Sequence, residues 1–132
     1  MDELPLMELA FPGPLRDRLV AAVLSGAKTT TTGLFLPDEP AEEAGQRLAV
    51  VDSAGRRVAV IEVTDVRVVR LSDVDLRHAV DEGEGDESVA GWRANHETFW
   101  HSEEVRAELG ADFRVDDDTL VVATRFRLLA TH

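Results

Sequence analysis

The sequence contains no cysteine, and this absence excludes several kinds of chemistry at once. Without a thiol the chain has no disulfide framework, no cysteine nucleophile and no zinc–thiolate site. It also lacks any apolar run approaching the roughly 20 residues that a membrane-spanning helix requires. The first residues, MDELPLMELAFPG, carry acids and no base, unlike the positive start of a signal peptide. We therefore expect a cytoplasmic protein without a membrane partner.

Basic residues are scarce as well. The chain has 14 lysines and arginines and 26 aspartates and glutamates, which gives a formal net charge of −12. Non-specific binding of nucleic acid depends on neutralising phosphates with lysine and arginine. The excess of acids therefore argues against a broad surface for duplex binding. It leaves open a small nucleoside-like ligand, or a short single-stranded RNA, held in a local pocket.

Two catalytic signatures are also missing, namely the glycine-rich phosphate loop and the nucleophile elbow. A metal site has only weak support. Glu82, Glu84 and Asp86 alternate with glycines, and carboxylates on a loop can bind a divalent ion. Their spacing does not match an EF-hand, and His96 and His101 are poorly spaced for shared ligation from one helix. We favour a solvated acidic loop and expect neither metal nor cofactor.

The 132 residues fit a single domain, residues 1–132, with an ordinary hydrophobic content of 44%. Residues 1–10 are expected to form an arm or an edge strand. A helix should begin with Pro14 at its first position and end at Gly26, a typical C-terminal cap. Residues 46–71 are rich in valine and predict a hairpin with a turn at 52–55 and a bulge near 65–66.

The rest of the chain, residues 72–132, predicts two helical stretches and a strand. The first helix is expected to be capped by Ser72 and to end near Gly83, and the second, over 88–110, to be capped by Ser88. The last strand, over 118–130, should alternate, with Leu120 and Leu128 on one face. This order predicts an α+β domain built on a small mixed β-barrel with helices packed around it. An open sheet with helices on one face is the alternative.

Lys28 is the only lysine of the chain, since the other 13 basic residues are arginines. It stands in SGAKTTTTGL, just after the expected helix cap. A turn there would bring Thr31 near the lysine amine, and a lysine beside a hydroxyl is a known way to activate a nucleophile. Arginine cannot replace it in that role, because arginine stays protonated whereas burial lowers the pKa of a lysine. The alternative is that the threonines are simply β-prone residues entering a strand.

Two segments together resemble a known family. SGAKTTTT resembles the G-x-K-x-x-T signature of ASCH domains, small barrels related to the PUA RNA-binding fold, with Gly26, Lys28 and Thr31 at the matching positions. EGEGDESVAGWRANHETFW resembles the acidic, glycine-containing segment and following helix of bacterial ASCH proteins. With the hairpin between them and the last strand, the resemblance covers roughly Phe11 to Arg127.

The resemblance implies a function and a set of site residues. Some small ASCH proteins are amidohydrolases that deacylate cytidine acylated on its exocyclic nitrogen. They use a lysine, a threonine three residues further on, and the glutamate that ends a His-Ala-x-x-Glu segment. The catalytic residues implied here are Lys28, Thr31 and Glu82. The substrate-binding residues are expected to be Gly26, Thr30, Glu84, Asp86, Trp92 and His96, of which Trp92 and His96 would stack on a base.

Other ASCH members imply different functions, namely metal-dependent ribonucleases and RNA-binding modules. The ribonuclease alternative would use Glu82, Glu84 or Asp86 as metal ligands. The chain departs from the smallest amidohydrolases by its GEGDES insertion and its tryptophan-rich helix, so the substrate stays open. Its acidity also departs from what an RNA-binding cleft needs. An amidohydrolase is the leading hypothesis, followed by a non-catalytic reader of RNA or a modified nucleotide, and then by the nuclease.

Overall fold

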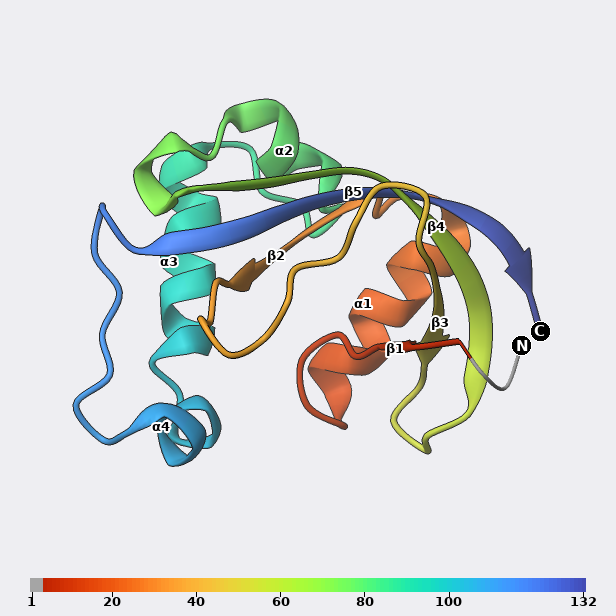
Figure 1. Cartoon of the computed structure of the whole chain (residues 1–132), viewed down its shortest axis with the longest axis horizontal. Helices are drawn as coiled ribbons and strands as arrows, with labels where there is room; N and C mark the ends of the chain where they lie inside the picture. Colours follow the sequence, from red (N-terminus) through yellow and green to blue (C-terminus); the bar gives the residue numbers. More distant parts are fainter. Residues whose placement is uncertain (1–3) are drawn as a thin grey trace.

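The computed structural model describes residues 4–132 and contains one five-stranded sheet in the order β1-β3-β4-β5-β2. β1 pairs with β3 in parallel, and every other pair is antiparallel. β4 and β5 are the long central strands and curve across the whole molecule (Figure 1). The strand bounds are β1 Leu6–Met7, β2 Thr30–Leu34, β3 Arg47–Val51, β4 Arg57–Arg70 and β5 Leu120–Thr131.

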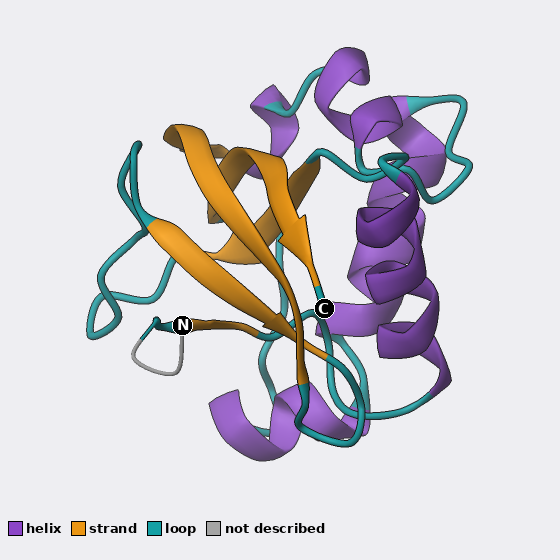
Figure 2. Ribbon diagram, turned by 90° about the vertical axis from the view of Figure 1, so that its right-hand side faces the viewer, coloured by secondary structure: helices purple, strands orange, loops and turns teal. Residues whose placement is uncertain are grey.

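Four α-helices and one 3₁₀ turn accompany the sheet. They are α1 Pro14–Ser25, η1 Leu71–Asp73, α2 Leu76–Asp81, α3 Val89–Trp100 and α4 Glu103–Leu109. α1 lies under one half of the curved sheet, whereas α2, α3 and α4 gather at the other end (Figure 1). The helices pack outside a strongly twisted sheet (Figure 2). None of the helices within residues 4–132 is both long and apolar enough to cross a membrane.

The sheet is open within the described residues. β1 and β2 form its two edges and do not pair with each other. The mixed α+β class is therefore correct, but the predicted closed barrel is not confirmed, and the alternative of an open sheet describes the strands better. The edges are short, two and five residues, which limits the unpaired backbone they present.

Local sequence signals explain the first half of the fold. α1 begins with Pro14 at its first position, and Gly26 ends it with φ 85°, a left-handed conformation that favours glycine. The hairpin turn is held by Asp52, whose carboxylate accepts hydrogen bonds from the backbone N–H groups of Ala54 and Arg56. The β4–β5 register shifts between Val63 and Asp65, next to the predicted bulge. The expected edge strand is β1, and residues 1–3 of the expected arm lie outside the described part.

Three details differ from the predictions. α2 is capped by Asp75, whose side chain accepts from the His78 N–H, because Ser72 is part of the preceding 3₁₀ turn. The stretch over 88–110 forms two helices, since Ser102 caps a new one, while Ser88 caps α3 as expected. Leu120 and Leu128 are exposed near the two ends of β5, whereas Val122 and Phe126, two residues of the same predicted face, are buried.

Two hydrophobic clusters fill the interior. The first lies between α1 and the strands β1, β3, β4 and β5 and includes the fully buried Ile61. The second joins η1, α2, α3 and β5 around Trp92 and Trp100. A group of buried polar side chains borders the second cluster, and this group forms the wall of a cavity.

Candidate active site

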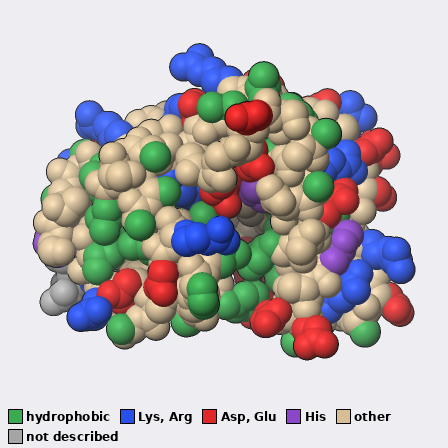
Figure 3. Space-filling view, turned by 180° about the vertical axis from the view of Figure 1, so that it is seen from behind, with side chains coloured by type: hydrophobic (Ala, Val, Ile, Leu, Met, Phe, Trp, Pro, Cys, Tyr) green, Lys and Arg blue, Asp and Glu red, His purple; other side chains and the backbone are tan. Residues whose placement is uncertain are grey.

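A cavity of about 1110 Å³ lies between the N-terminal segment with α1 on one side and β2, α3 and α4 on the other. Figure 3 shows a hollow near the centre of the rear face, with histidine and carboxylate atoms beside it and hydrophobic side chains below it. His96 is the histidine that lines the cavity among residues 4–132. Lys28, Thr31, Thr32, Glu82 and Glu84 line it as well. The cavity is large enough for a nucleoside with a substituent.

Lys28 is placed by the loop that joins α1 to β2. Its backbone N–H donates to the Ala22 carbonyl at 3.0 Å, which continues the helix end formed by Gly26. Its side chain is almost completely buried, with 2% of the residue exposed. The amine lies 3.5 Å from Glu82 Oε1 and 3.8 Å from Glu84 Oε2, and it donates to the Glu82 carbonyl at 3.4 Å. The only lysine of the chain therefore stands between two carboxylates.

The end of α2 is fixed against this loop by backbone contacts. The Thr29 N–H donates to the Asp81 carbonyl at 2.8 Å, and the Thr30 hydroxyl donates to the His78 carbonyl at 2.9 Å. Gly83 follows with φ 72°, and a Cβ there would lie 2.5 Å from the Ala27 carbonyl oxygen. Only glycine allows this approach. The contacts set Lys28 and Glu82 side by side although they are 54 positions apart in the sequence.

Glu82 is a buried carboxylate surrounded by donors. Its Oε2 accepts from the Thr32 hydroxyl at 2.7 Å and from the Trp92 indole N–H at 2.8 Å. Its Oε1 faces His96 Nε2 at 3.1 Å and the Lys28 amine at 3.5 Å. His78 Nε2 lies 2.7 Å from the Thr32 hydroxyl and 3.4 Å from Oε2. Because the Thr32 hydroxyl donates to Glu82, its oxygen is free to accept from His78.

His96 has an acceptor at each ring nitrogen. Nδ1 lies 2.9 Å from the Trp92 carbonyl oxygen, and Nε2 faces the Glu82 carboxylate. A carbonyl oxygen accepts but never donates, so both ring nitrogens carry hydrogen when Glu82 is ionised. The ring stacks on Trp92 with centroids 4.2 Å apart and meets Trp100 edge-on. We therefore assign His96 as an imidazolium.

These surroundings move the pKa values in opposite directions. Burial raises the pKa of Glu82, but hydrogen bonds from His78 and His96 and the charge of Lys28 outweigh it and hold the pKa well below its usual range. Burial lowers the pKa of His96, but the Glu82 carboxylate outweighs it and raises the pKa. The pKa of Glu84 is raised, chiefly by burial and then by the charge of Glu82, although Lys28 opposes the shift.

Thr31 and Thr32 lie next to each other on β2 and differ in their bonding. Thr32 bonds with Glu82, whereas the Thr31 hydroxyl makes no hydrogen bond within residues 4–132 and is free at the cavity wall. Lys28 lies in the loop before β2, and Thr31 is the second residue of β2. The backbone between them therefore passes from a loop into an extended strand. No hydrogen bond joins the two side chains, but both line the same cavity, as Glu82 does.

The other expected site residues divide into two groups. Glu84 and His96 line the cavity. Gly26, Thr30, Asp86 and Trp92 do not: Gly26 caps α1, Thr30 is buried against α2, Asp86 accepts from Asn95, and Trp92 is fully buried beneath His96. The structure places Trp92 as a donor to Glu82 instead of a stacking surface.

Thr32 and His78 were not predicted as site residues. The Thr32 hydroxyl donates to the Glu82 carboxylate, and His78 hydrogen-bonds with the Thr32 hydroxyl. One signal was available, because His78 and Glu82 stand four residues apart and so share one face of a helical turn. Thr32 has no comparable signal among four identical neighbours.

The donor set does not fit a metal ion well. Oxygen and nitrogen atoms of Glu82, Glu84 and His96 lie within 4.8 Å of one another, close enough to surround a cation. The Lys28 ammonium already lies between the two carboxylates, however, and both His96 nitrogens face acceptors, which leaves no lone pair for a metal. We describe the group as a charge cluster of Lys28, Glu82, Glu84 and His96.

Comparisons with known proteins agree on one family. The sequence model of the ASCH domain matches residues 8–130. The structure is similar to an ASCH domain from Lactobacillus crispatus JV V101, with a TM-score of 0.74, 27% identity, and coverage of 94% of this chain and 79% of that chain. It is also similar to a protein from Enterococcus faecalis V583, with a TM-score of 0.79, 24% identity, and coverage of 95% and 76%.

A third structure, a mutant ASCH protein from Zymomonas mobilis, shares the fold alone. Its TM-score is 0.55 at 10% identity, with coverage of 96% of this chain and 73% of that chain. No curated protein matches the sequence.

Proposed function

Because the chain belongs to the ASCH domain family, we propose that its cavity is the active site of an amidohydrolase that removes an acyl group from the exocyclic nitrogen of a cytidine-like nucleoside. One observation carries the proposal. The single lysine is buried beside two carboxylates at the wall of a large cavity, and a threonine hydroxyl without a hydrogen-bond partner among residues 4–132 lines the same cavity. A nucleophile, a base and a carboxylate are the groups that amide hydrolysis needs.

The proposed reaction proceeds in two halves. In the first, the Thr31 oxygen attacks the amide carbonyl carbon while Lys28, in its uncharged form, takes the hydroxyl proton. The C–N bond breaks, the amine leaves with a proton, and the acyl group remains on Thr31 as an ester. In the second, water attacks the ester, the acid leaves, and Thr31 recovers its proton. Glu82 fixes the lysine amine through a hydrogen bond at 3.5 Å, which the amine donates in its uncharged form as well.

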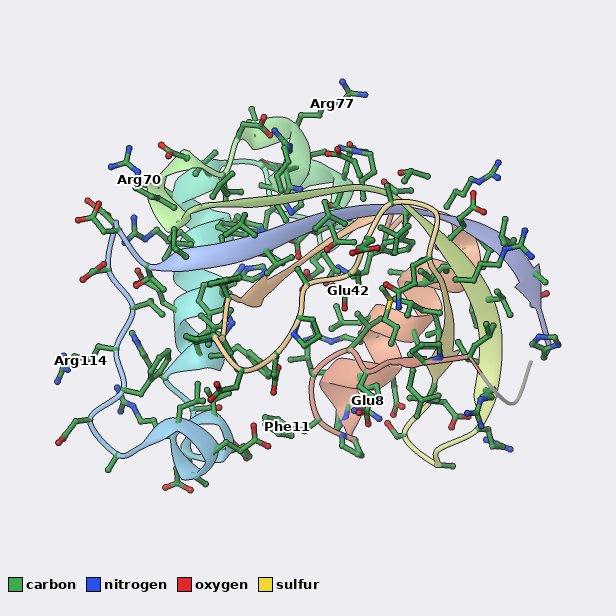
Figure 4. All side chains as sticks on the ribbon, viewed as in Figure 1. Glu8, Phe11, Glu42, Arg70, Arg77 and Arg114 are labelled. Carbon is green, nitrogen blue, oxygen red and sulfur yellow. The ribbon has the colours of Figure 1, made fainter. Side chains whose placement is uncertain are left out.

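Charge favours a nucleoside over RNA as the ligand. Among residues 4–132 the cavity is lined by six glutamates and three basic side chains; these are Glu8, Glu39, Glu42, Glu82, Glu84 and Glu108 against Arg18, Lys28 and the His96 imidazolium. Glu8 and Glu42 are labelled in Figure 4 on the segments beside the cavity. Phosphate groups would be repelled by this lining. The base and ribose of a nucleoside carry no charge and meet no such penalty.

The test is hydrolysis of N4-acetylcytidine by the wild type, Lys28→Arg and Thr31→Val. The release of cytidine is measured. We expect the wild type to be active and both variants to lose activity, Lys28→Arg by roughly 10²–10⁴-fold in kcat, the usual contribution of a general base. Thr131→Val, an exposed threonine at the end of β5, is the matched control and should retain activity.

Two results would contradict the proposal. Full activity of Lys28→Arg would remove the lysine as base. Binding of a short single-stranded RNA that weakens as salt rises, without any hydrolysis, would favour a reader of RNA instead.

A further inference from the structure

We propose that Glu84, and not Glu82, is the carboxyl group that exchanges protons with a ligand in the cavity, while Glu82 remains a carboxylate that holds Lys28. The family resemblance selects Glu82 as the catalytic carboxylate. The geometry separates the two glutamates instead, because they face different surroundings. The catalytic role of Glu84 rests on the proposed function. That Glu84 takes up a proton while Glu82 stays ionised does not depend on it.

Glu82 has no capacity left for a ligand. Its side chain is 1% exposed, and its two oxygens face Thr32, Trp92, His96 and Lys28 within 3.5 Å. Protonating it would place a hydrogen against donors and break at least one of these bonds. His96 contributes most directly, since its second N–H is engaged by the Trp92 carbonyl and the ring keeps its charge toward Glu82.

Glu84 is connected differently. Its side chain is 27% exposed and lines the cavity, and its ion pair is with Lys28 at 3.8 Å. It lies on the loop between α2 and α3, one residue after Gly83. Three charged groups face it: Lys28 from the α1–β2 loop, His96 from α3, and Glu82 from its own loop. Glu84 is thus open to a ligand and close to the proposed base.

Two neighbouring carboxyl groups with unlike environments commonly divide into an acid and a permanent anion. The raised pKa of Glu84, due first to burial and then to Glu82, and the lowered pKa of Glu82 agree with this division. When Glu84 carries the proton, the charge cluster can give it to a ligand while Glu82 stays a carboxylate beside Lys28.

The proton transfer completes the proposed reaction. As the C–N bond of the tetrahedral intermediate breaks, the Glu84 carboxylic acid gives its proton to the leaving nitrogen, which departs as a neutral amine. In the second half, the Glu84 carboxylate takes a proton from the water that attacks the Thr31 ester. Lys28 then returns its proton to the Thr31 oxygen. The products are one carboxylic acid and one amine for each amide and water consumed.

The first experiment measures protonation without a ligand. The side-chain carboxyl carbons of the glutamates are titrated by carbon-13 NMR in the wild type, with Glu84→Gln and Glu82→Gln used to assign the two signals. We expect the Glu84 signal to titrate above the ordinary value of about 4.3, and the Glu82 signal to stay ionised wherever the protein is folded. A Glu82 signal that titrates at the higher pH would overturn the proposal.

The second experiment measures catalysis on N4-acetylcytidine. Glu84→Gln should lower kcat by about 100-fold with little change in KM, and it should abolish the fall in rate that the wild type shows as pH rises through the Glu84 pKa. Glu84→Asp should recover part of the rate, and Glu87→Gln, an exposed acid of the same loop, is the matched control. An unchanged pH profile in Glu84→Gln would overturn the catalytic role. If the wild type hydrolyses nothing, the amidohydrolase fails while the NMR titration still decides the place of the proton.

Discussion

The two halves of the molecule bury different chemistry. Under α1, the first hydrophobic cluster is built from aliphatic side chains such as Ile61 and Val50, both fully buried. At the α2–α3 end, the second cluster borders a lysine and a glutamate that are only 2% and 1% exposed. The first half is stabilised by removing apolar surface from water, which needs no particular partner. The second half depends on each polar group having its own partner.

The two halves differ in how strictly each requires particular side chains at particular positions. An aliphatic core tolerates substitutions of similar volume, because its attraction is not directional. The charge cluster tolerates few, since removing one member leaves the buried polar groups beside it without their partner. We infer that the first half supports the fold and that the second half fixes the geometry of the cavity wall.

Removing the Glu82 carboxylate should produce the largest effect and tests the comparison directly. Glu82→Ala leaves the Trp92 indole N–H and the Thr32 hydroxyl without their carboxylate acceptor and removes the ion pair with Lys28, and breaking a buried ion pair typically costs about 3–5 kcal/mol. We expect urea unfolding to show a loss of this size. Glu62→Ala is the matched control, because Glu62 accepts from Arg127 at the surface of the sheet and should matter much less. Equal losses in the two variants would contradict the distinction between the halves.

Local sequence signals predicted the first half well. Pro14 and Gly26 mark the ends of α1, and the valine-rich hairpin and its turn stand where the pattern places them. Each of these signals acts within a few residues of the chain, so a single sequence contains it. Local signals could not decide whether the sheet closes into a barrel, because closure depends on whether two edge strands that are distant in the sequence meet.

The candidate site was only partly predictable for the same reason. Lys28 stood out as a unique residue, and the resemblance selected Glu82. The partners of Glu82 come from β2, α2 and α3, so their convergence depends on tertiary packing and not on spacing. Trp92 shows the consequence: its position on a helix face predicted a stacking surface, whereas the fold buries it and uses its N–H.

The two halves should also differ in how their stability depends on pH, an effect that we expect to be smaller than that of Glu82→Ala. The folded pKa of His96 is raised, so its contribution is fully present below the unfolded value of about 6.5 and is lost as pH rises through the folded pKa. Glu84 changes stability in the same direction, starting above about 4.3, because its pKa is also raised. Glu82 acts oppositely, since its lowered pKa gives stability above about 4.3 that is lost as pH falls.

The measurement is the urea midpoint between pH 6 and pH 9 for the wild type and His96→Gln. The wild type should lose stability as pH rises, and His96→Gln should show a flatter curve that begins lower. His132→Gln, at an exposed histidine, is the control and should follow the wild type. Parallel curves for the wild type and His96→Gln would mean that the ring is not charged against Glu82.

The smallest effect concerns the contact that joins the halves across the cavity. Phe11, just before α1, points toward the side that holds α3 and α4 (Figure 4), and its ring lies 5.9 Å from that of Phe99 on α3. Such aromatic pairs are coupled by about 0.5–1.5 kcal/mol. A double-mutant cycle with Phe11→Leu and Phe99→Leu should give a coupling energy in this range in urea unfolding. Because both rings line the cavity but neither belongs to the charge cluster, the coupling should be the same at pH 6 and pH 9. A coupling that changes with pH would show that the two halves are not independent and that the cavity wall behaves as one unit.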